Sequence, residues 1–304
     1  MKVIISGGTG FIGSELATSL VRDGNDVIVL SRDPGRVHHL PANVRVENWD
    51  GRTTEGWGKL ITNADAIVNL AGEGIDAGRW DARHRQRIIE SRVTAGEAIV
   101  QAIEASAKKP SVLIQASAVG YYGARSSEGV GEDGSAGNDF MAKICLAWEA
   151  STMKAETYGV RRVVIRTGAV LSPKHGALRR MLFPFKMGVG GPVGGGKQWF
   201  SWIHIDDEVR AIRFLLDNLS ASGNFNLTAP NPLTNRQFSK ALGRVLRRPA
   251  IMPIPAFALR LFYGEMSRVI LDGQRVIPVR LLKLGFEFGF RDIEAALRDL
   301  LKER

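Results

Sequence analysis

The chain contains one cysteine, Cys145, so it cannot form an internal disulfide, and a reducing compartment is expected. It also lacks an apolar run of about 18 residues, the length that a membrane-spanning helix needs. The first residues enter an apolar strand and a glycine loop directly, without the apolar stretch and cleavage site of a secretory signal. These absences predict a cytoplasmic protein without membrane spans.

Concentrated charge is absent too. The net charge is +10, and 29 of the 41 basic residues are arginine, but no block of five or more like charges occurs. Most arginines are therefore expected on solvated helix faces, and the chain shows no nucleic-acid motif or aromatic stacking platform. Five scattered histidines and one cysteine have no metal-ligand spacing. Neither a nucleic-acid partner nor a metal is predicted.

Short apolar strands alternate with amphipathic segments through the first 170 residues. Strands are expected over residues 2–6, 27–30, 44–49, 66–71, 112–117 and 162–167. A helix is expected to follow the glycine loop to about residue 22, and two more are expected over residues 82–106 and 138–158. This alternation predicts an α/β fold, a Rossmann-type doubly wound parallel sheet with right-handed crossovers.

The pattern changes after residue 171. Residues 188–196 are too rich in glycine for regular structure, and prolines and short helices follow residue 230. We expect an NADP-binding domain of residues 1–170 plus about 199–229. About 171–198 and 230–304 would then form a smaller, discontinuous C-terminal domain for a substrate or partner.

A glycine loop follows the first strand, where Gly7, Gly10 and Gly13 give the spacing G-x-x-G-x-x-G before a helix. Gly7 would permit the tight turn, Gly10 the approach of a pyrophosphate, and Gly13 close packing of helix and strand. Unpaired N–H groups and the positive end of the helix dipole would face the anion. The loop predicts a dinucleotide site.

The end of the second strand indicates which dinucleotide is bound. An NAD site usually has a carboxylate there for the ribose hydroxyl, but this strand ends in Ser31 and Arg32. A planar guanidinium suits a 2′-phosphate, and Ser31 can donate a second bond, so NADP(H) is predicted. The alternative is that Arg32 stacks on adenine or lies in solvent. Asp50 would accept from the adenine amino group or cap a turn.

Several segments resemble the extended, epimerase-like branch of the short-chain dehydrogenase/reductase superfamily. They are SGGTGFIG (6–13), LSR (30–32), NLAG (69–72), QASAVGYYG (115–123), VVIRTGAVL (163–171) and WIHIDD (202–207). FKMGVGGP (185–192) and GQRVIP (273–278) are similar to an NADP-dependent, epimerase-like subgroup with its own C-terminal domain of unknown function. The resemblance implies the fold, NADP(H) binding and oxidoreductase or epimerase-like activity. It implies these cofactor contacts: Thr9, Gly10, Phe11, Ile12, Ser31, Arg32, Leu70, Ala71 and Arg92.

The chain departs from the superfamily's proton relay, a tyrosine and a lysine four residues apart on the helix after the fifth strand. If Lys143 is that lysine, the tyrosine position is Asp139; if Glu149 is the anchor, the pair becomes Met141 and Cys145. Neither register contains the tyrosine, whose hydroxyl would be the general acid or base.

Other residues are candidates for the missing role. Tyr121 or Tyr122 could donate the proton, Ser117 could position a substrate carbonyl, and Lys143 could contact the ribose. His204 is expected to have a structural role, and Asp206 to cap the next helix. Several aromatic residues are expected to line an apolar pocket, and they are Phe183, Phe185, Trp199, Phe200 and Trp202.

Two functions therefore remain open. The first is an NADP(H)-dependent oxidoreductase or epimerase-like enzyme with a displaced proton donor and a small-molecule substrate that the sequence does not identify. The second is a non-catalytic NADP(H)-binding sensor or assembly factor. No membrane partner is predicted, and the sequence does not indicate an oligomeric state.

Overall fold

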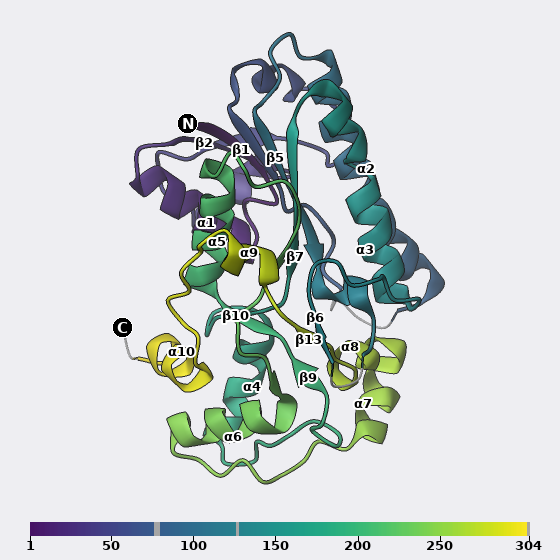
Figure 1. The fold of residues 1–304 in the computed structure, drawn as a ribbon, viewed down its shortest axis with the longest axis vertical. Helices are drawn as coiled ribbons and strands as arrows, with labels where there is room; N and C mark the ends of the chain where they lie inside the picture. The colour runs from purple at the N-terminus through teal and green to yellow at the C-terminus, as the bar shows by residue number, and fades with distance from the viewer. Residues whose placement is uncertain (76–79, 126–127, 303–304) are drawn as a thin grey trace.

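A seven-stranded parallel sheet forms the centre of the protein, in a computed structural model that describes residues 1–75, 80–125 and 128–302 (Figure 1). Its strand order is β11-β7-β5-β4-β1-β2-β3. The strands are β1 (Lys2–Ser6), β2 (Asp26–Ser31), β3 (Arg45–Asn48), β4 (Ala66–Asn69), β5 (Val112–Ala118), β7 (Arg161–Thr167) and β11 (Gly223–Leu227). The order reverses at β1, whose neighbours are β2 and β4. The predicted doubly wound Rossmann-type sheet is confirmed.

Apolar side chains on both faces of the sheet explain its two helical layers. Val3 and Ile5 of β1 join one core with Leu16 of α1 (Phe11–Arg22), while Ile4 joins another core with Ile99 of α2 (Ala82–Ala105). Successive strand residues point to opposite faces, so both sides must be covered. Figure 1 shows α1 and α5 (Ile205–Asp217) on one side, and α2 and α3 (Phe140–Ala150) on the other.

The single helix predicted over residues 138–158 is wrong. Helix α3 ends at Ala150, and a separate 3₁₀ helix follows at Met153–Tyr158. The Ser151 hydroxyl donates to the Trp148 carbonyl, and Ser151 packs so closely on α2 that a Cβ added at Gly96 would lie 2.0 Å from its Oγ. This close approach of two helices explains why the chain breaks here despite its apolar periodicity.

Smaller elements occupy the remainder of the described chain. The strands are β6 (Gly129–Val130), β8 (Ala169–Leu171), β9 (Trp199–Phe200), β10 (Trp202–His204), β12 (Leu233–Thr234) and β13 (Arg275–Val276). The α-helices are α4 (Gly176–Lys186), α6 (Asn235–Leu246), α7 (Ala256–Tyr263), α8 (Arg268–Leu271), α9 (Val279–Lys283) and α10 (Ile293–Leu300). The 3₁₀ helices are η1 (Pro34–Arg36), η2 (Gly58–Asn63), η3 (Val119–Tyr122), η4 (Met153–Tyr158) and η5 (Gly264–Ser267).

A separate apolar core lies among α4, α6 and α10 and includes Leu178, Trp202, Phe238 and Leu297. The expected glycine-rich irregular segment is confirmed, since residues 188–196 contain only an isolated bridge at Val193. The boundaries of the two domains stay a prediction. No helix in the described part of the chain has the length and apolarity to span a membrane.

Side chains complete the outer edge of strand β11. The Asn226 N–H donates to Oε1 of Glu132 at 3.0 Å, and the Arg280 guanidinium donates to the Asn224 carbonyl at 3.3 Å. The Asn226 side chain donates to the Ile277 carbonyl at 3.0 Å. The opposite edge strand, β3, has only four residues, of which Arg45 and Glu47 form an ion pair.

Candidate functional site

The glycine loop joins β1 to α1 at the carboxyl edge of the sheet. Gly7 has a positive φ of +70°, and a Cβ there would lie 2.6 Å from the Leu70 carbonyl oxygen. A Cβ at Gly13 would lie 2.3 Å from the Gly7 oxygen, so larger residues would separate helix and loop. Gly10 is the N-cap of α1, without a side-chain cap. The first-turn N–H groups therefore suit an anion.

Arg32 follows β2, beside this loop. Leu30 pairs with Ser6 in the parallel register, so the ends of β1 and β2 are neighbours. Arg32 is exposed and makes no ion pair with any described residue, whereas the nearby Asp33 pairs with Arg36 at 3.0 Å. The Ser31 hydroxyl accepts from the Asp33 N–H at 3.2 Å. The guanidinium of Arg32 is thus available to a phosphate.

Arg92 on α2 lies beneath the end of β4. Its side chain is 8% exposed, and a Cβ added at Gly72 would lie 3.0 Å from its Cζ. Nη1 donates to the Ile88 carbonyl at 2.9 Å, but Nε has no hydrogen-bond partner among the described residues. Burial lowers the pKa of this guanidinium. A buried cation without a paired carboxylate has an electrostatic preference for an anion.

Two further side chains can be placed: Asp50, which the sequence predicted at the adenine or in a turn, and His39, which it did not include. Asp50 caps a turn: its carboxylate accepts from the N–H groups of Arg52 and Thr53, both at 2.8 Å. These hydrogen bonds, led by that from Thr53, lower the pKa of Asp50. His39 Nε2 lies 3.2 Å from the Thr9 carbonyl oxygen, a contact that no local sequence pattern indicated.

The structure distinguishes the two registers proposed for α3. Asp139 is its N-cap, accepting from the Ala142 N–H at 2.9 Å, and Lys143 is exposed. Met141 and Cys145, four residues apart, instead face η3: a Cβ at Gly120 would lie 3.2 Å from Met141 and 3.8 Å from Cys145. The face of α3 toward the end of β5 therefore carries two sulfur side chains.

Cys145 is almost completely buried, and this burial raises the pKa of its thiol to about 11. Its Sγ lies 3.6 Å from the Ala118 carbonyl oxygen. A thiol in this state is protonated at neutral pH and is a poor nucleophile. This geometry makes Cys145 a core residue rather than a nucleophile.

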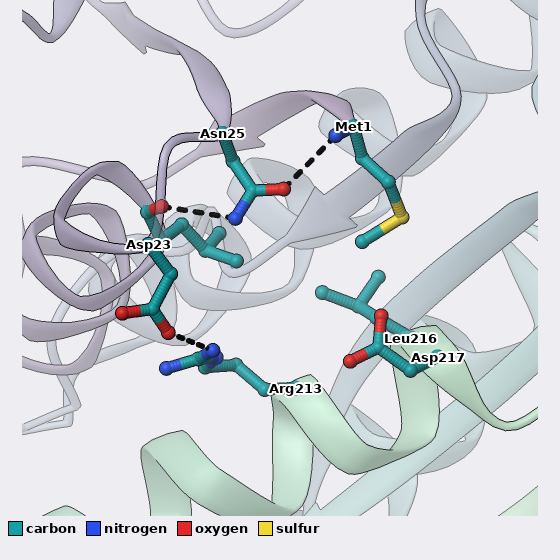
Figure 2. Close-up of a pocket in the computed structure, with 7 residues that line it drawn as sticks. Met1, Asp23, Asn25, Arg213, Leu216 and Asp217 are labelled. Carbon is teal, nitrogen blue, oxygen red and sulfur yellow. Dashed lines mark hydrogen bonds and ion pairs between the residues drawn. The ribbon is translucent and has the colours of Figure 1, made fainter.

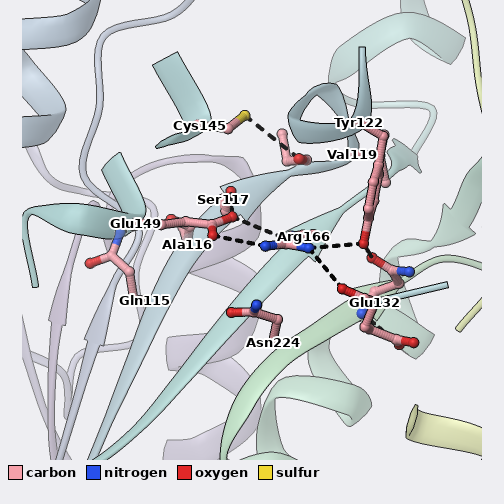
Figure 3. A network of polar contacts seen from close by, with 12 residues as sticks. Gln115, Ala116, Ser117, Val119, Tyr122, Glu132, Cys145, Glu149, Arg166 and Asn224 are labelled. Carbon is pink, nitrogen blue, oxygen red and sulfur yellow. Dashed lines mark hydrogen bonds and ion pairs between the residues drawn. The ribbon is translucent and has the colours of Figure 1, made fainter. Parts of the chain in front are cut away.

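Ser117 and Tyr122 belong to a buried polar network, shown in Figure 3. Ser117 donates to Glu149 Oε1 at 2.7 Å, and Glu149 forms a two-pronged ion pair with Arg166 at 2.9 and 3.0 Å. The Tyr122 hydroxyl donates to Asn226 at 2.7 Å and accepts from Arg166 at 3.1 Å. Burial raises the pKa of Tyr122. Its hydroxyl is thus engaged within the protein.

The sequence interpretation did not identify Glu149 and Arg166 as a pair. Their one signal was a second arginine inside the apolar strand segment Arg-Val-Val-Ile-Arg-Thr, whose charge requires a buried partner. Arg166 also lies over Tyr121, with its Cζ 3.4 Å from the ring centroid, so Tyr121 is the second aromatic wall of this network.

His204 lies at the N-cap of α5, where its Nδ1 accepts from the Asp206 N–H at 3.0 Å. The prediction that Asp206 caps this helix is therefore wrong, because the histidine ring takes that position. His204 stacks on Phe290 with centroids 3.8 Å apart. Possible ligand atoms of His204, Asp206 and Asp299 lie within 4.8 Å of one another, but the helix cap already uses Nδ1.

The aromatic residues predicted to wall a pocket are divided in the structure. Phe185 and Trp202 are buried in the core among α4, α6 and α10, Trp199 and Phe200 are half-buried, and Phe183 is exposed. Phe200 also packs against that core, so three of the five residues belong to it, whereas Phe183 does not.

A hollow of about 260 Å³ lies away from the glycine loop (Figure 2). Met1 and Asn25 border it, and the Met1 amino group donates to Asn25 Oδ1 at 3.0 Å. Met1 begins the chain just before β1, so this hollow lies at the amino ends of the strands. Ligands of doubly wound sheets bind at the opposite, carboxyl ends.

The fold and these residues can be compared with known proteins. Residues 3–228 match the NAD dependent epimerase/dehydratase family, and residues 254–300 match a domain of unknown function, DUF1731. The epimerase family protein YfhF of Bacillus subtilis is 38% identical over 307 residues, covering 100% of this chain and 99% of that protein. Epimerase family protein Mb2239 of Mycobacterium bovis is 40% identical, covering 97% of this chain and 96% of that protein.

Solved structures agree with this relationship. The human epimerase family protein SDR39U1, crystallised with NADPH, has a TM-score of 0.88 and 30% identity, with 100% of both chains covered. A UDP-glucuronic acid 4-epimerase from Bacillus cereus shares the fold, with a TM-score of 0.79 at 17% identity, over 99% of both chains. On these matches, the chain belongs to the NAD dependent epimerase/dehydratase family.

Proposed function

We propose that this chain binds NADP(H) and acts as an oxidoreductase or epimerase-like enzyme without the Tyr-x-x-x-Lys relay. The NADPH-bound human relative supports the cofactor. The observation that carries the proposal is a pair of arginines near the carboxyl edge of the sheet, exposed Arg32 and buried Arg92, neither of which forms an ion pair with a described residue. A phosphorylated dinucleotide bound at this edge would bring negative charge close to both side chains.

The described residues fit this group. The N–H groups of the loop from Gly7 to Gly13 would hold the pyrophosphate, with Thr9, Phe11 and Ile12 among the contacts, and Ser31 and Arg32 would hold the 2′-phosphate. Leu70 and Ala71 would border the ribose, and Arg92 would supply a further cation. When bound, the cofactor supplies hydride chemistry.

Around the reacting centre, the chain offers an unusual set of groups. Ser117 is the candidate for positioning a substrate carbonyl, for which its hydroxyl must first exchange the hydrogen bond that it donates to Glu149 at 2.7 Å. Met141 and Cys145 provide no acidic proton at the usual place on α3. Tyr122 stays a candidate donor, although it must first exchange its hydrogen bond to Asn226. We also propose that segments 171–198 and 230–304 form the substrate domain.

The cofactor assignment predicts a preference that direct titration measures. Wild type should bind NADPH about 10- to 100-fold more tightly than NADH, because a charged hydrogen bond contributes about 1.5–3 kcal/mol. Arg32→Ala should lose most of this preference. Arg52→Ala, a change at another exposed arginine in a neighbouring loop, is the matched control and should retain it. Equal affinities of wild type for both cofactors would contradict the assignment.

A non-catalytic NADP(H) sensor is the second candidate, favoured by the sulfur side chains on α3. Turnover distinguishes the two: loss of NADPH absorbance is followed on a panel of sugars, aldehydes, ketones and quinones. The enzyme should oxidise NADPH with at least one of them, and Ser117→Ala or Tyr122→Phe should reduce the rate without weakening NADPH binding. Tight binding with silence across the panel, and a partner captured only with cofactor, would favour the sensor.

A further inference from the structure

Positive charge gathers in two segments that contain no aspartate or glutamate, residues 171–205 and 230–264. Together they carry 11 lysines and arginines, more than the whole chain's net charge of +10. All 11 are exposed: Lys174, Arg179, Arg180, Lys186, Lys197, Arg236, Lys240, Arg244, Arg247, Arg248 and Arg260. The remainder of the chain carries 30 basic and 31 acidic residues, so the excess positive charge of the protein lies in these two segments.

The same segments expose large apolar side chains. Residues 251–255, with the sequence Ile-Met-Pro-Ile-Pro, are all exposed and form an apolar strap between α6 and α7. Ile251 is 78% exposed, and Phe257 on the following helix is 72% exposed. Met187, at the end of α4, is exposed as well. Consecutive exposed apolar residues of this size mark an interaction surface rather than ordinary solvent contact.

Backbone contacts join the strap to the segment that follows α4. The strap runs beside residues 188–194: the Met252 N–H donates to the Gly190 carbonyl at 3.2 Å, and the Ile254 N–H donates to the Pro192 carbonyl at 2.9 Å. Figure 1 shows α4, α6 and α7 together at the lower end of the view. We call this surface, made by α4, α6, the strap and α7, the basic–apolar face.

A hollow of about 380 Å³ opens on the basic–apolar face at the end of α6. Lys240, Arg244, Arg247 and Arg248 line it together with Ile251. Arg244 pairs with Glu294, but no described carboxylate pairs with the other three cations. Cations beside an exposed aliphatic side chain match the two parts of a lipid interface, phosphate and acyl chain.

We propose that the basic–apolar face docks the protein on an anionic lipid bilayer, with the strap and Phe257 in the interface and the cations on headgroup phosphates. A second copy of the chain is a poor occupant, because a two-fold contact would bring this positive surface against itself. Soluble nucleic acid would match the charge but would leave the aliphatic residues without a role. Such surface binding needs no membrane-spanning helix, and none is found among the described residues. The proposal differs from the expectation that the chain has no membrane partner.

Vesicle sedimentation tests the proposal with the full chain. Wild type should bind to vesicles of phosphatidylcholine that contain about one third phosphatidylglycerol. It should bind much less to vesicles of pure phosphatidylcholine. Arg247→Glu/Arg248→Glu should weaken binding by about 25-fold or more, since each basic residue contributes about 1 kcal/mol at such a surface. Ile251→Ser/Met252→Ser should also weaken it, by about tenfold, through lost apolar burial.

The matched control is Arg52→Glu/Lys59→Glu, which changes the net charge equally at two exposed sites of the nucleotide-binding part. It should bind vesicles nearly as wild type does, and all variants should keep the wild-type melting temperature and NADPH affinity. The proposal is overturned if the control weakens binding as much as the Arg247/Arg248 change. It is also overturned if the serine variant binds vesicles as wild type does, which would indicate that the natural ligand is a soluble polyanion. Dimerisation through the basic–apolar face, or binding of an acidic protein there, would likewise overturn it.

Discussion

Glu208, in the first turn of α5, is a fully buried carboxyl with incomplete hydrogen bonding. The Thr167 hydroxyl donates to Oε1 at 2.8 Å, while Oε2 has no partner among the described residues. Burial raises the pKa of Glu208 to about 8, and the Thr167 bond opposes this only in part. The carboxyl is therefore protonated in the folded protein at neutral pH, whereas the unfolded chain ionises it above about pH 4.5.

This difference makes stability depend on pH in a definite direction. Between about pH 4.5 and 8 the folded state holds a proton that the unfolded state releases, so stability falls as pH rises through this range. Glu208→Gln removes the ionisation and keeps the shape. Its melting temperature should exceed that of wild type by roughly 5 °C or more at pH 8, with little difference near pH 4.5. A constant difference across this range would contradict the buried proton.

At this scale, the sequence could predict local patterns only. The glycine spacing and the replacement of an acid by Arg32 lie within short segments, so their expected placement could be read from the sequence. Glu208 follows Asp206 and Asp207 in an acidic run that is typical of an exposed helix start. The burial of Glu208 depends on contacts with Thr167 and with neighbouring strands, which are distant in sequence.

Helix α3 is held to the sheet by charge as well as by apolar contacts. Glu149 on α3 and Arg166 on β7 form the two-pronged pair, and Arg166 is 2% exposed. Such pairs add little net stability over apolar replacements, but removing one partner leaves a buried charge.

Glu149→Ala should therefore lower the free energy of unfolding by about 3–5 kcal/mol, because Arg166 remains buried without its carboxylate. The double change Glu149→Leu/Arg166→Met should recover most of this loss, and urea unfolding would measure both. If the single change costs less than about 1 kcal/mol, water reaches the network and the pair is not as isolated as its burial indicates.

The register of α3 shows why helix chemistry is harder to predict than loop chemistry. Lys143 and Cys145 are both plausible by spacing, and only the face turned toward η3 decides between them. The predicted end of this helix is wrong for a related reason. Periodicity continues past Ala150, while the contact of Ser151 with α2 interrupts the helix.

Asp207 joins the two parts of the molecule that sequence alone treats as separate. It is fully buried on α5, and its carboxylate accepts from the N–H groups of Gly289 and Phe290, at 2.9 and 2.8 Å, and from Arg210 at 2.8 Å. The segment that leads into α10 is thereby fixed against the Rossmann-type sheet layer. The sequence predicted both parts, but not this connection.

Asp207→Ala should loosen that segment specifically. Amide hydrogen exchange over residues 286–300 should become faster, while the strands of the central sheet keep their protection, because the lost acceptors hold only this segment. Asp206→Ala, at the exposed neighbouring position, is the control and should leave exchange unchanged. Uniformly faster exchange would mean that Asp207 stabilises the whole fold instead.

The outer edge of β11, where side chains hydrogen-bond to the backbone, has a consequence for aggregation at high protein concentration. The carboxylate of Glu132 and the guanidinium of Arg280 take the backbone groups that a foreign strand would need. At the other margin, β3 is short and carries alternating charge. Neither edge strand offers a long row of free backbone groups with which a strand of another polypeptide could pair. The side chains at the two edges therefore protect this sheet against fibril-like growth.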